Sequence, residues 1–216
     1  MALVAKGELA VENFDVFCEK GVFELEHTRR LLEAARESKL ALNFHAEELH
    51  HLGSAQLGAE LGARAISHLE HVDVDGIAAM ASAGVVAVVL PTTAHVLRLK
   101  PPPVRDMIAA GVAVALGTDF NPNAHCLSLP LTMNLACVLM HMSLDEALVA
   151  ATINAAASLG RSDRCGSLEI GKRGDLVLID APSWHHVVYQ MGDPPVELVA
   201  VRGRVVYRRA EGGVDR

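Results

Sequence analysis

The sequence predicts an α/β protein built around a parallel sheet. Helix-like and strand-like segments alternate four times over residues 24–119, which is the pattern of repeated βα units. One strand-like segment, residues 85–90 (VVAVVL), is an almost continuous β-branched run, typical of a strand buried on both faces of a parallel sheet. Polar side chains gather where these segments end, and active sites of α/β folds form at that edge.

The four predicted units follow one another closely. Residues 24–38 carry Thr28, Leu31, Leu32 and Ala35 at helical spacing, with charges on the other face, and the segment KLALNFH at 39–45 reads as a strand. The second unit is expected as a short helix from the break at 52–53 to Leu61, followed by a strand at 63–68. The third is a helix at 74–83, ended by Gly84, with the strand at 85–90. The fourth is a helix at 101–110 that begins with prolines, with a strand within 111–119.

The pattern changes after Asp119. Residues 121–123 (NPN) predict a loop, and apolar helices are expected at 127–142 and 144–159. Strands follow at 175–180, 197–201 and 204–207, with a hairpin turn at 202–203 between the last two. The predicted division is therefore an α/β region with C-terminal helices at 11–165, a small β appendage at 166–209 and a frayed tail at 210–216.

Composition excludes several classes of partner. The chain has 216 residues with 19 Lys and Arg against 26 Asp and Glu, a net charge of −7, and only 4% aromatic residues, which argues against binding to nucleic acid or to anionic membranes. No apolar run approaches the roughly 18 residues of a membrane span, and Lys6 and Glu8 interrupt any secretory signal. Four cysteines form no CxxC pair, as expected for reduced thiols. We expect a soluble, cytosolic protein.

Polar residues follow three of the predicted strands. His45 ends the first strand, with Glu48 three residues on; His68 ends the second; Asp119 ends the fourth, with Asn121 and Asn123 after it. Strand alternation puts His45 on the side of Ala41 and Asn43, and Asp119 on the side of Ala113, Ala115 and Gly117, where small residues leave room for a ligand. Imidazoles with a carboxylate suit zinc or iron. The residues alone leave a structural role and a site about equally open.

Seven motifs in order carry a resemblance to a known family. They are DVFCEKGVF (15–23), NFHAEELH (43–50), AISHLEH (65–71), LPTTA (90–94), ALGTDFNPNAHC (115–126), ATINAAASLGR (151–161) and GSLEIGKRGDLVLID (166–180). Together they resemble the imidazolonepropionase family of the amidohydrolase superfamily. The resemblance implies a distorted (β/α)₈ barrel with a flanking β domain, one zinc or iron ion, and hydrolytic opening of 4-imidazolone-5-propanoate to N-formimidoyl-L-glutamate in histidine breakdown.

The resemblance also implies a role for each site residue. His45 matches a metal ligand, and Asp119 matches the metal-bound carboxylate that takes a proton from the attacking water. Glu48 matches the residue that contacts the ring and the water, and His68 the histidine that steadies developing charge. Asn121 matches a substrate-binding position, and Asn123 stands where many bacterial members carry Gly, so its expected contact is through the backbone.

One family feature does not occur in this sequence. Amidohydrolases carry a His-x-His pair on the first barrel strand, and no such pair is present here. The chain therefore resembles the second half of the enzyme, with strands five to eight in a partial barrel at 11–165; an open α/β sheet is the alternative from strand count alone, since a closed barrel needs eight strands. Three functions stay open: a shortened imidazolonepropionase acting on imidazolonepropionate, a cyclic-amidine deaminase, or an inactive chain that caps its full-length homologue. Homo-oligomer formation is also left open.

Overall fold

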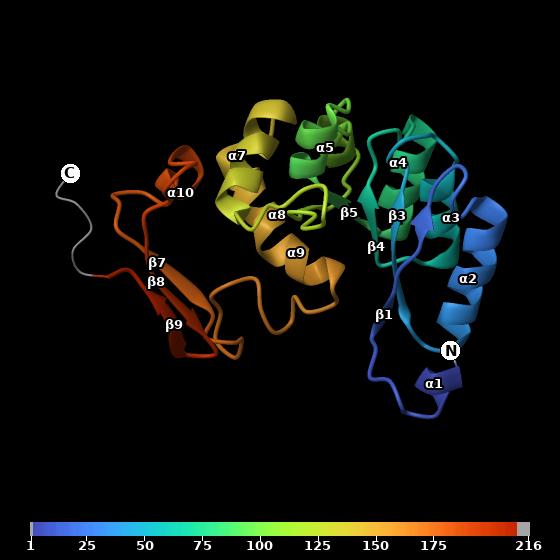
Figure 1. Ribbon diagram of the computed structural model, residues 1–216, viewed down its shortest axis with the longest axis horizontal. Helices are drawn as coiled ribbons and strands as arrows, with labels where there is room; N and C mark the ends of the chain where they lie inside the picture. Colours follow the sequence, from blue (N-terminus) through green and yellow to red (C-terminus); the bar gives the residue numbers. More distant parts are fainter. Residues whose placement is uncertain (1, 211–216) are drawn as a thin grey trace.

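The computed structural model describes residues 2–210, and a parallel sheet forms its centre (Figure 1). The strands run in the order β1-β3-β4-β5-β6, and β2 also pairs with β3. Their bounds are β1 Asn13–Phe14, β2 Phe17–Cys18, β3 Ala41–Ala46, β4 Ala65–His68, β5 Val86–Val89 and β6 Val114–Leu116. All neighbouring pairs in this sheet are parallel. The predicted α/β class with a parallel sheet is confirmed.

The edge of the sheet beside β3 was not predicted. Asn13 pairs with Ala41 and Phe17 pairs with His45, so β1 and β2 keep one register and act as a single interrupted edge strand. Two-residue strands carry too little alternation to be recognised in a sequence. Because paired residues point to the same face, this register places Asp15 and Phe17 on the face of His45.

Helices connect the strands at the expected places. They are α2 Leu25–Glu37, α3 Ser54–Leu61, α4 Val74–Ala83, α5 Pro91–Leu97, α6 Val104–Ala109, α7 Leu129–Leu139, α8 Leu144–Ala151 and α9 Ile153–Ser158. The prediction for α4 is confirmed at both ends, because the Asp73 side chain accepts the Gly76 amide and Gly84 ends the helix with φ 68°. The unpredicted α5 begins with Pro91, whose fixed φ suits a first helical position.

Two predictions in this region were wrong in detail. The single helix expected at 144–159 is broken at Thr152, which has φ −123° and ψ −91° and donates its hydroxyl to the Leu148 carbonyl at 2.6 Å. That bond ties Thr152 to the preceding turn and competes with continuation of the helix. The strand expected to reach Asp119 ends at Leu116 instead.

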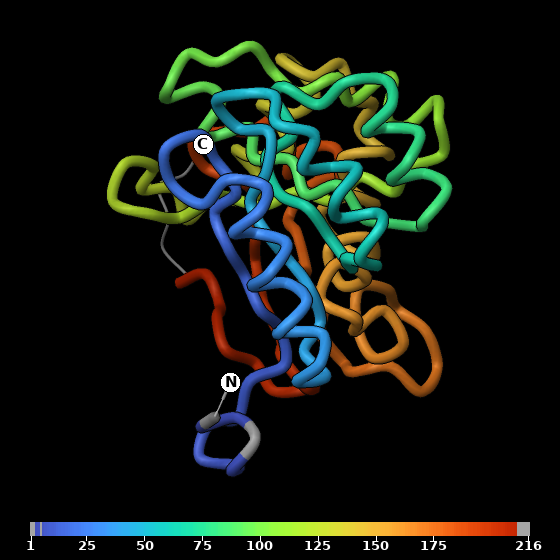
Figure 2. The backbone as a smooth tube through the Cα atoms, turned by 90° about the vertical axis from the view of Figure 1, so that its right-hand side faces the viewer, coloured from blue at the N-terminus to red at the C-terminus, as the bar shows by residue number. Residues whose placement is uncertain are grey.

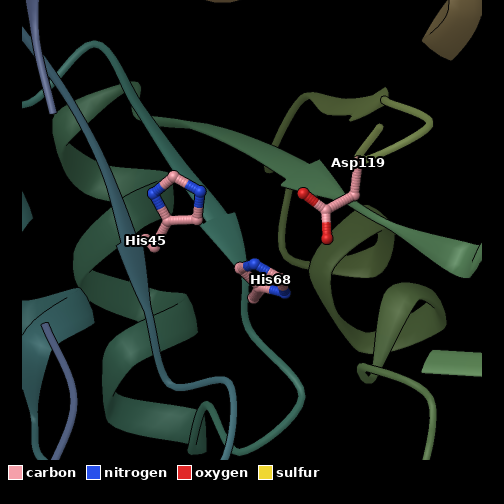
Figure 3. Close-up of side chains that lie close together, drawn as sticks. All are labelled: His45, His68 and Asp119. Carbon is pink, nitrogen blue, oxygen red and sulfur yellow. The ribbon is translucent and has the colours of Figure 1, made fainter. Parts of the chain in front are cut away.

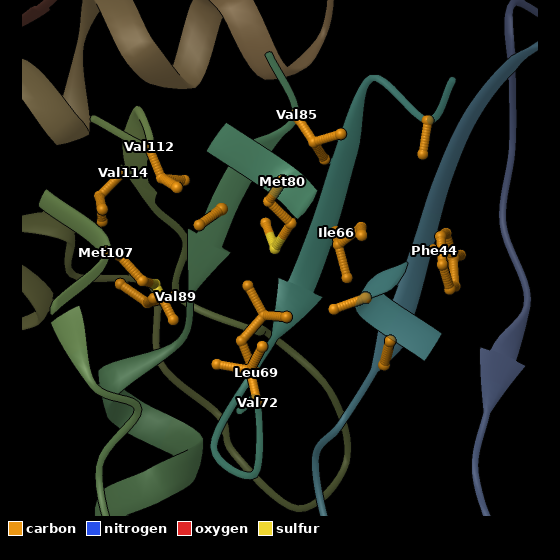
Figure 4. Packing of buried hydrophobic residues seen from close by; sticks show 14 of the residues in the cluster. Phe44, Ile66, Leu69, Val72, Met80, Val85, Val89, Met107, Val112 and Val114 are labelled. Atoms are coloured by element: carbon orange, nitrogen blue, oxygen red, sulfur yellow. The ribbon is translucent and has the colours of Figure 1, made fainter. Parts of the chain in front are cut away.

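The main core contains buried residues of the sheet and of helices α2, α3, α4, α6, α7 and α8, and Figure 4 shows part of it. Residues on alternate positions of β3, Leu42, Phe44 and Ala46, are buried there, and Ala41, Asn43 and His45 on the other face are half-buried. The burial of β3 therefore follows the predicted period of two. Phe44 and Ile66 in this core are at most 1% exposed.

The opposite face of the sheet is covered near its amino end by α9. Ala65, Val86 and Ala115 are buried there, and Ala155 and Ala157 of α9 pack against them. Ala115 of β6 therefore packs against a helix, and the cleft described below lies at the carboxyl end of the sheet.

A second sheet follows in the chain. It consists of β7 Leu176–Ile179, β8 Val196–Val201 and β9 Arg204–Arg208, all antiparallel, and α10 (His186–Tyr189) lies between β7 and β8 in sequence. Arg202 and Gly203 both have positive φ, as a two-residue hairpin turn requires, so the predicted turn is confirmed. Helices α7, α8 and α9 lie between the two sheets (Figure 1).

Helix α1 (Ala2–Ala5) lies at the bottom of the molecule in both views (Figures 1 and 2), and its Val4 packs against the main core. Residues 211–216 of the predicted tail lie outside the described residues. The division of the chain between residues 165 and 166 stays a prediction. Within residues 2–210, every helix is too short or too polar to cross a bilayer.

Candidate metal centre

The predicted site residues line one cleft at the carboxyl edge of the parallel sheet. The cleft has a volume of about 460 Å³. Its walls include all six predicted residues, His45, Glu48, His68, Asp119, Asn121 and Asn123. They come from three separate parts of the chain, so the fold brings together what the sequence placed at three strand ends.

Three of these side chains converge on one point (Figure 3). His45, His68 and Asp119 each offer one ligand atom, and these atoms lie within 4.8 Å of one another. The two imidazole rings have their centroids 5.3 Å apart. Asp119 lies opposite both rings with its carboxylate turned toward them (Figure 3).

His45 is held by a carboxylate on the edge strand. Its Nδ1 lies 2.8 Å from Asp15 Oδ1. The hydrogen bond that the His45 ring donates to Asp15 is the main cause that raises the pKa of His45, against burial, which lowers it. A carboxylate on one ring nitrogen orients a histidine and leaves Nε2 for a metal or substrate.

His68 lies deeper, between two glutamates. It is 2% exposed; Glu48 Oε2 lies 3.5 Å from its Nε2 and Glu70 Oε2 lies 3.7 Å from its Nδ1. Burial raises the pKa of Glu48, and the nearby imidazole of His68 opposes that rise. Among residues 2–210, His68 Nδ1 and both Glu70 carboxyl oxygens are buried without a hydrogen-bond partner.

Asp119 reaches the cleft from a loop and not from a strand end. It follows β6 by three residues and has φ 48°, so strand alternation does not determine its direction. Its Oδ2 accepts the hydroxyl of Thr93 and the Asn121 side-chain amide, the latter at 3.1 Å. In the described part of the chain no donor is bound to Oδ1, which is therefore available as a ligand or base.

The loop after Asp119 is organised by one amide side chain. Asn121 donates to the Asp119 carbonyl at 2.7 Å and accepts the backbone N–H of Asn123 at 2.8 Å. Asn123 is exposed and is bound to Asn121 through its backbone N–H. Asn121 is thus tied to both the carboxylate and the loop that borders the cleft.

Four residues in or next to the cleft have left-handed backbone. Glu47, His68, Leu69 and Asp119 have φ of 57°, 78°, 71° and 48°. Each such conformation in a residue other than Gly costs of the order of ~1–3 kcal/mol and persists where its surroundings hold it. Such strain is typical of functional sites.

The donor set fits a zinc or iron ion. Two imidazoles and a carboxylate with an open side match the three protein ligands of catalytic zinc sites, and imidazole also suits iron. His45 and Asp119 are the predicted ligands, and His68, predicted as a catalytic residue, lies in the same cluster. His68 Nδ1 faces the buried Glu70 carboxyl at 3.7 Å, so the ring presents Nε2 on the side of Glu48 and the cleft.

Sequence reasoning missed three residues that support the site. Asp15 binds His45, Thr93 binds Asp119, and Glu70 is buried beside His68. Asp15 and Thr93 lie within the motifs DVFCEKGVF and LPTTA, so those motifs were the signal for them. Glu70 follows His68 by two residues within the motif AISHLEH, but its burial could not be predicted from the sequence.

Comparison with known proteins gives consistent matches. The profile of the Amidohydrolase family matches residues 19–206. A Nematostella vectensis protein named "Probable imidazolonepropionase" is 61% identical over 208 residues, which is 95% of this chain and 48% of the relative. A Homo sapiens protein of the same name is 56% identical over 204 residues, 94% of this chain and 48% of the relative. The chain spans about half the length of the curated relatives it matches.

Solved structures share the fold. A zinc-bound adenosine deaminase from Xanthomonas campestris superimposes with a TM-score of 0.74 at 24% identity, over 89% of this chain and 51% of that one. This likeness concerns the fold alone.

Proposed function

Because the chain belongs to the amidohydrolase family, we propose that it carries the catalytic edge of a metal-dependent hydrolase that opens the ring of 4-imidazolone-5-propanoate to N-formimidoyl-L-glutamate in histidine degradation. The observation that carries the proposal is the convergence of His45, His68 and Asp119 at one end of the sheet. The substrate is suggested by relatives that are 56–61% identical and bear the imidazolonepropionase name.

The proposed ligands are His45 and Asp119, with one zinc or iron ion between them. The ion, when bound, supplies Lewis acidity that makes water a better nucleophile near neutral pH. The hydrogen bond of Asp15 to His45 Nδ1 keeps Nε2 directed to this position. Thr93 and Asn121 fix one oxygen of Asp119, so the carboxylate cannot turn away from the cleft.

Asp119 is the proposed proton carrier. Its Oδ1 can accept a proton from the attacking water and pass it to the ring nitrogen that leaves when the carbon–nitrogen bond breaks. This requires the attacking water and the leaving ring nitrogen to lie within hydrogen-bond reach of the Asp119 carboxylate. The loop position of Asp119, at the border of the cleft, is compatible with that requirement.

Glu48 and His68 are the proposed partners of the substrate ring. Burial raises the pKa of Glu48, so its carboxyl can hold a proton at a higher pH than an exposed glutamate and donate it to a ring atom. His68 lies 3.5 Å away and can steady the charge that develops as water adds. Asn121 and the backbone of Asn123 are the proposed substrate contacts at the rim.

The ion is proposed to be held within this chain by His45 and Asp119, with His68 in the same cluster. The sequence contains no His-x-His pair, which amidohydrolases use to complete the site. We place β3, β4, β5 and β6 as strands five to eight of a (β/α)₈ barrel, in agreement with the half-length coverage of the relatives.

The test is identification of the product. The chain is supplied with zinc or iron and given 4-imidazolone-5-propanoate, beside Asp119→Asn and the exposed-acid control Asp75→Asn. Formimidoylglutamate without ammonia, lost in Asp119→Asn and kept in Asp75→Asn, is the expected result. Release of ammonia would identify a cyclic-amidine deaminase instead.

A second candidate is an inactive chain that associates with a full-length homologue. It is favoured because the sequence has no His-x-His pair and because the chain matches only 48% of the length of the Nematostella vectensis relative. It predicts no turnover by the purified chain and co-purification with the full-length protein when the two are expressed together. Turnover by the chain alone would contradict it.

A further inference from the structure

Two buried glutamates flank the loop that carries Glu48, and the proposed chemistry uses neither. Glu19 follows β2 and is 2% exposed; Glu47 follows β3 and is fully buried. Neither lines the cleft. We call residues 48–53 the Glu48 loop.

Glu19 binds the loop immediately after Glu48. Its Oε2 accepts the Leu49 backbone N–H at 2.9 Å, and its Oε1 lies 2.8 Å from His50 Nδ1. Oε1 also accepts the N–H of Lys20 at 2.8 Å. Burial alone would raise the pKa of Glu19, but the Leu49 and Lys20 amides and His50 outweigh it and leave the pKa lowered. Glu19 is therefore a charged acceptor for two consecutive loop residues.

Glu47 binds the other end of the same loop. Its Oε1 accepts the Ser54 N–H at 2.5 Å and the Ser54 hydroxyl at 2.8 Å, and its Oε2 accepts the Leu52 N–H at 3.1 Å. Helix α3 begins at Ser54, and its N-cap residue Gly53 has no side chain to bind the first amides. Glu47 supplies that cap from seven residues upstream. Its own φ of 57° shows that the backbone is held in a strained turn beside Glu48.

The two acids thus fix the residues on both sides of Glu48. Glu47 precedes it and is anchored to the start of α3, and Leu49 follows it and is anchored to Glu19. The Glu48 side chain between them extends to His68, with Oε2 3.5 Å from Nε2. A backbone fixed at both neighbours leaves the Glu48 carboxyl few directions.

We propose that Glu19 and Glu47 are positioning residues that hold the Glu48 loop so that the Glu48 carboxyl stays against His68 in the cleft. The importance of this for catalysis rests on the proposed function of Glu48. The positioning itself does not, because it concerns contacts within this chain.

The variants are Glu19→Gln and Glu47→Gln, which keep side-chain size but replace one acceptor oxygen with an amide group that faces N–H donors. The matched control is Glu60→Gln, an exposed acid of α3 paired with Arg29. Since a variant at a buried residue can fail to fold, His50→Ala serves as a milder variant. The His50 side chain is 51% exposed, and its removal breaks a single contact of Glu19.

The first readout is hydrogen exchange of single amides. We expect Leu49 to exchange at least tenfold faster in Glu19→Gln, Ser54 at least tenfold faster in Glu47→Gln, and Leu49 a few-fold faster in His50→Ala. Glu60→Gln should change neither. Unchanged exchange of Leu49 in Glu19→Gln and in His50→Ala would overturn the proposal.

The second readout is the ¹⁵N signal of His68 Nε2, which a merely structural role would not move. In Glu19→Gln and Glu47→Gln it should shift toward its position in Glu48→Gln, and adding either change to Glu48→Gln should shift it no further. A signal that stays at the wild-type position in the folded variants would overturn the proposal. Absence of turnover by the wild-type chain would refute only the proposed function, because the His68 signal still reports the position of Glu48.

Discussion

The substitution Gly58→Ala would have two opposing effects on stability, because alanine favours the helix while its Cβ crowds the core. Gly58 lies in α3 and faces the sheet, and a Cβ built on it would lie 2.6 Å from Ile66 Cδ1 and 2.9 Å from Phe44 Cε1. Both contacts are shorter than van der Waals distance, and both side chains are at most 1% exposed. The Cβ of alanine would therefore displace the side chains of two fully buried core residues.

The net effect follows from two magnitudes. Ala is favoured over Gly inside a helix by about 1 kcal/mol. Forcing an extra carbon into a packed core costs about 1–3 kcal/mol, and two contacts under 3.0 Å place this case in the upper part of that range. We expect the free energy of unfolding to fall by about 1–2 kcal/mol. For a chain of this size that corresponds to a Tm lower by about 2–8 °C.

The assay is thermal unfolding of Gly58→Ala with Ile66→Val as its partner. Ile66→Val alone should cost about 0.5–1.5 kcal/mol. Ile66→Val removes the atom nearest to the new Cβ. In the Gly58→Ala background it should therefore lower the free energy of unfolding by less, or raise it, with a coupling energy of about 0.5 kcal/mol or more. A higher Tm for Gly58→Ala, or strict additivity with Ile66→Val, would refute the packing argument.

Three further predictions concern a helix cap, a histidine and the cleft. Ser143→Ala removes the capping box of α8 and should lower the free energy of unfolding by about 1 kcal/mol, measured by denaturant titration; an effect no larger than that of exposed Ser82→Ala would contradict it. In the metal-free protein Asp15 raises the pKa of His45 above its ordinary 6.5, so this pair stabilises the fold below pH 6.5 and the stabilisation is lost as pH rises through the raised pKa. Asp15→Asn should lower that pKa in an NMR titration, and an unchanged pKa would argue against the hydrogen bond. Under the proposed function, Glu48→Gln should reduce turnover about 10²–10⁴-fold without loss of metal; wild-type turnover would remove Glu48 from the chemistry.

The fold was predictable where one local rule decides the structure. Helix α4 has an Asp cap and a Gly stop, and both ends agree with the prediction. Strand β3 alternates along its length, so the face of His45 could be inferred. Thr152 illustrates the limit, because its break of an apolar helical pattern depends on its own backbone angles and a hydroxyl bond.

The candidate site was predictable as a set of residues but not as a geometry. All six predicted residues line the cleft, because carboxyl ends of parallel strands meet at one edge. Asp119 reaches it through a left-handed loop residue, which strand alternation did not predict. Asp15 contacts His45 from a segment 30 residues away, and such a long-range contact leaves no local pattern.

The most direct test of the metal centre is the metal content of the purified chain. The protein is loaded with zinc or with iron, dialysed and analysed for metal per chain, beside Asp119→Asn and the exposed control Asp75→Asn. Because three ligand atoms already lie within 4.8 Å of one another, we predict close to one ion per chain, lost in Asp119→Asn and kept in Asp75→Asn. A metal content no higher than that of Asp119→Asn would contradict the assignment of His45, His68 and Asp119 as a metal centre in this chain.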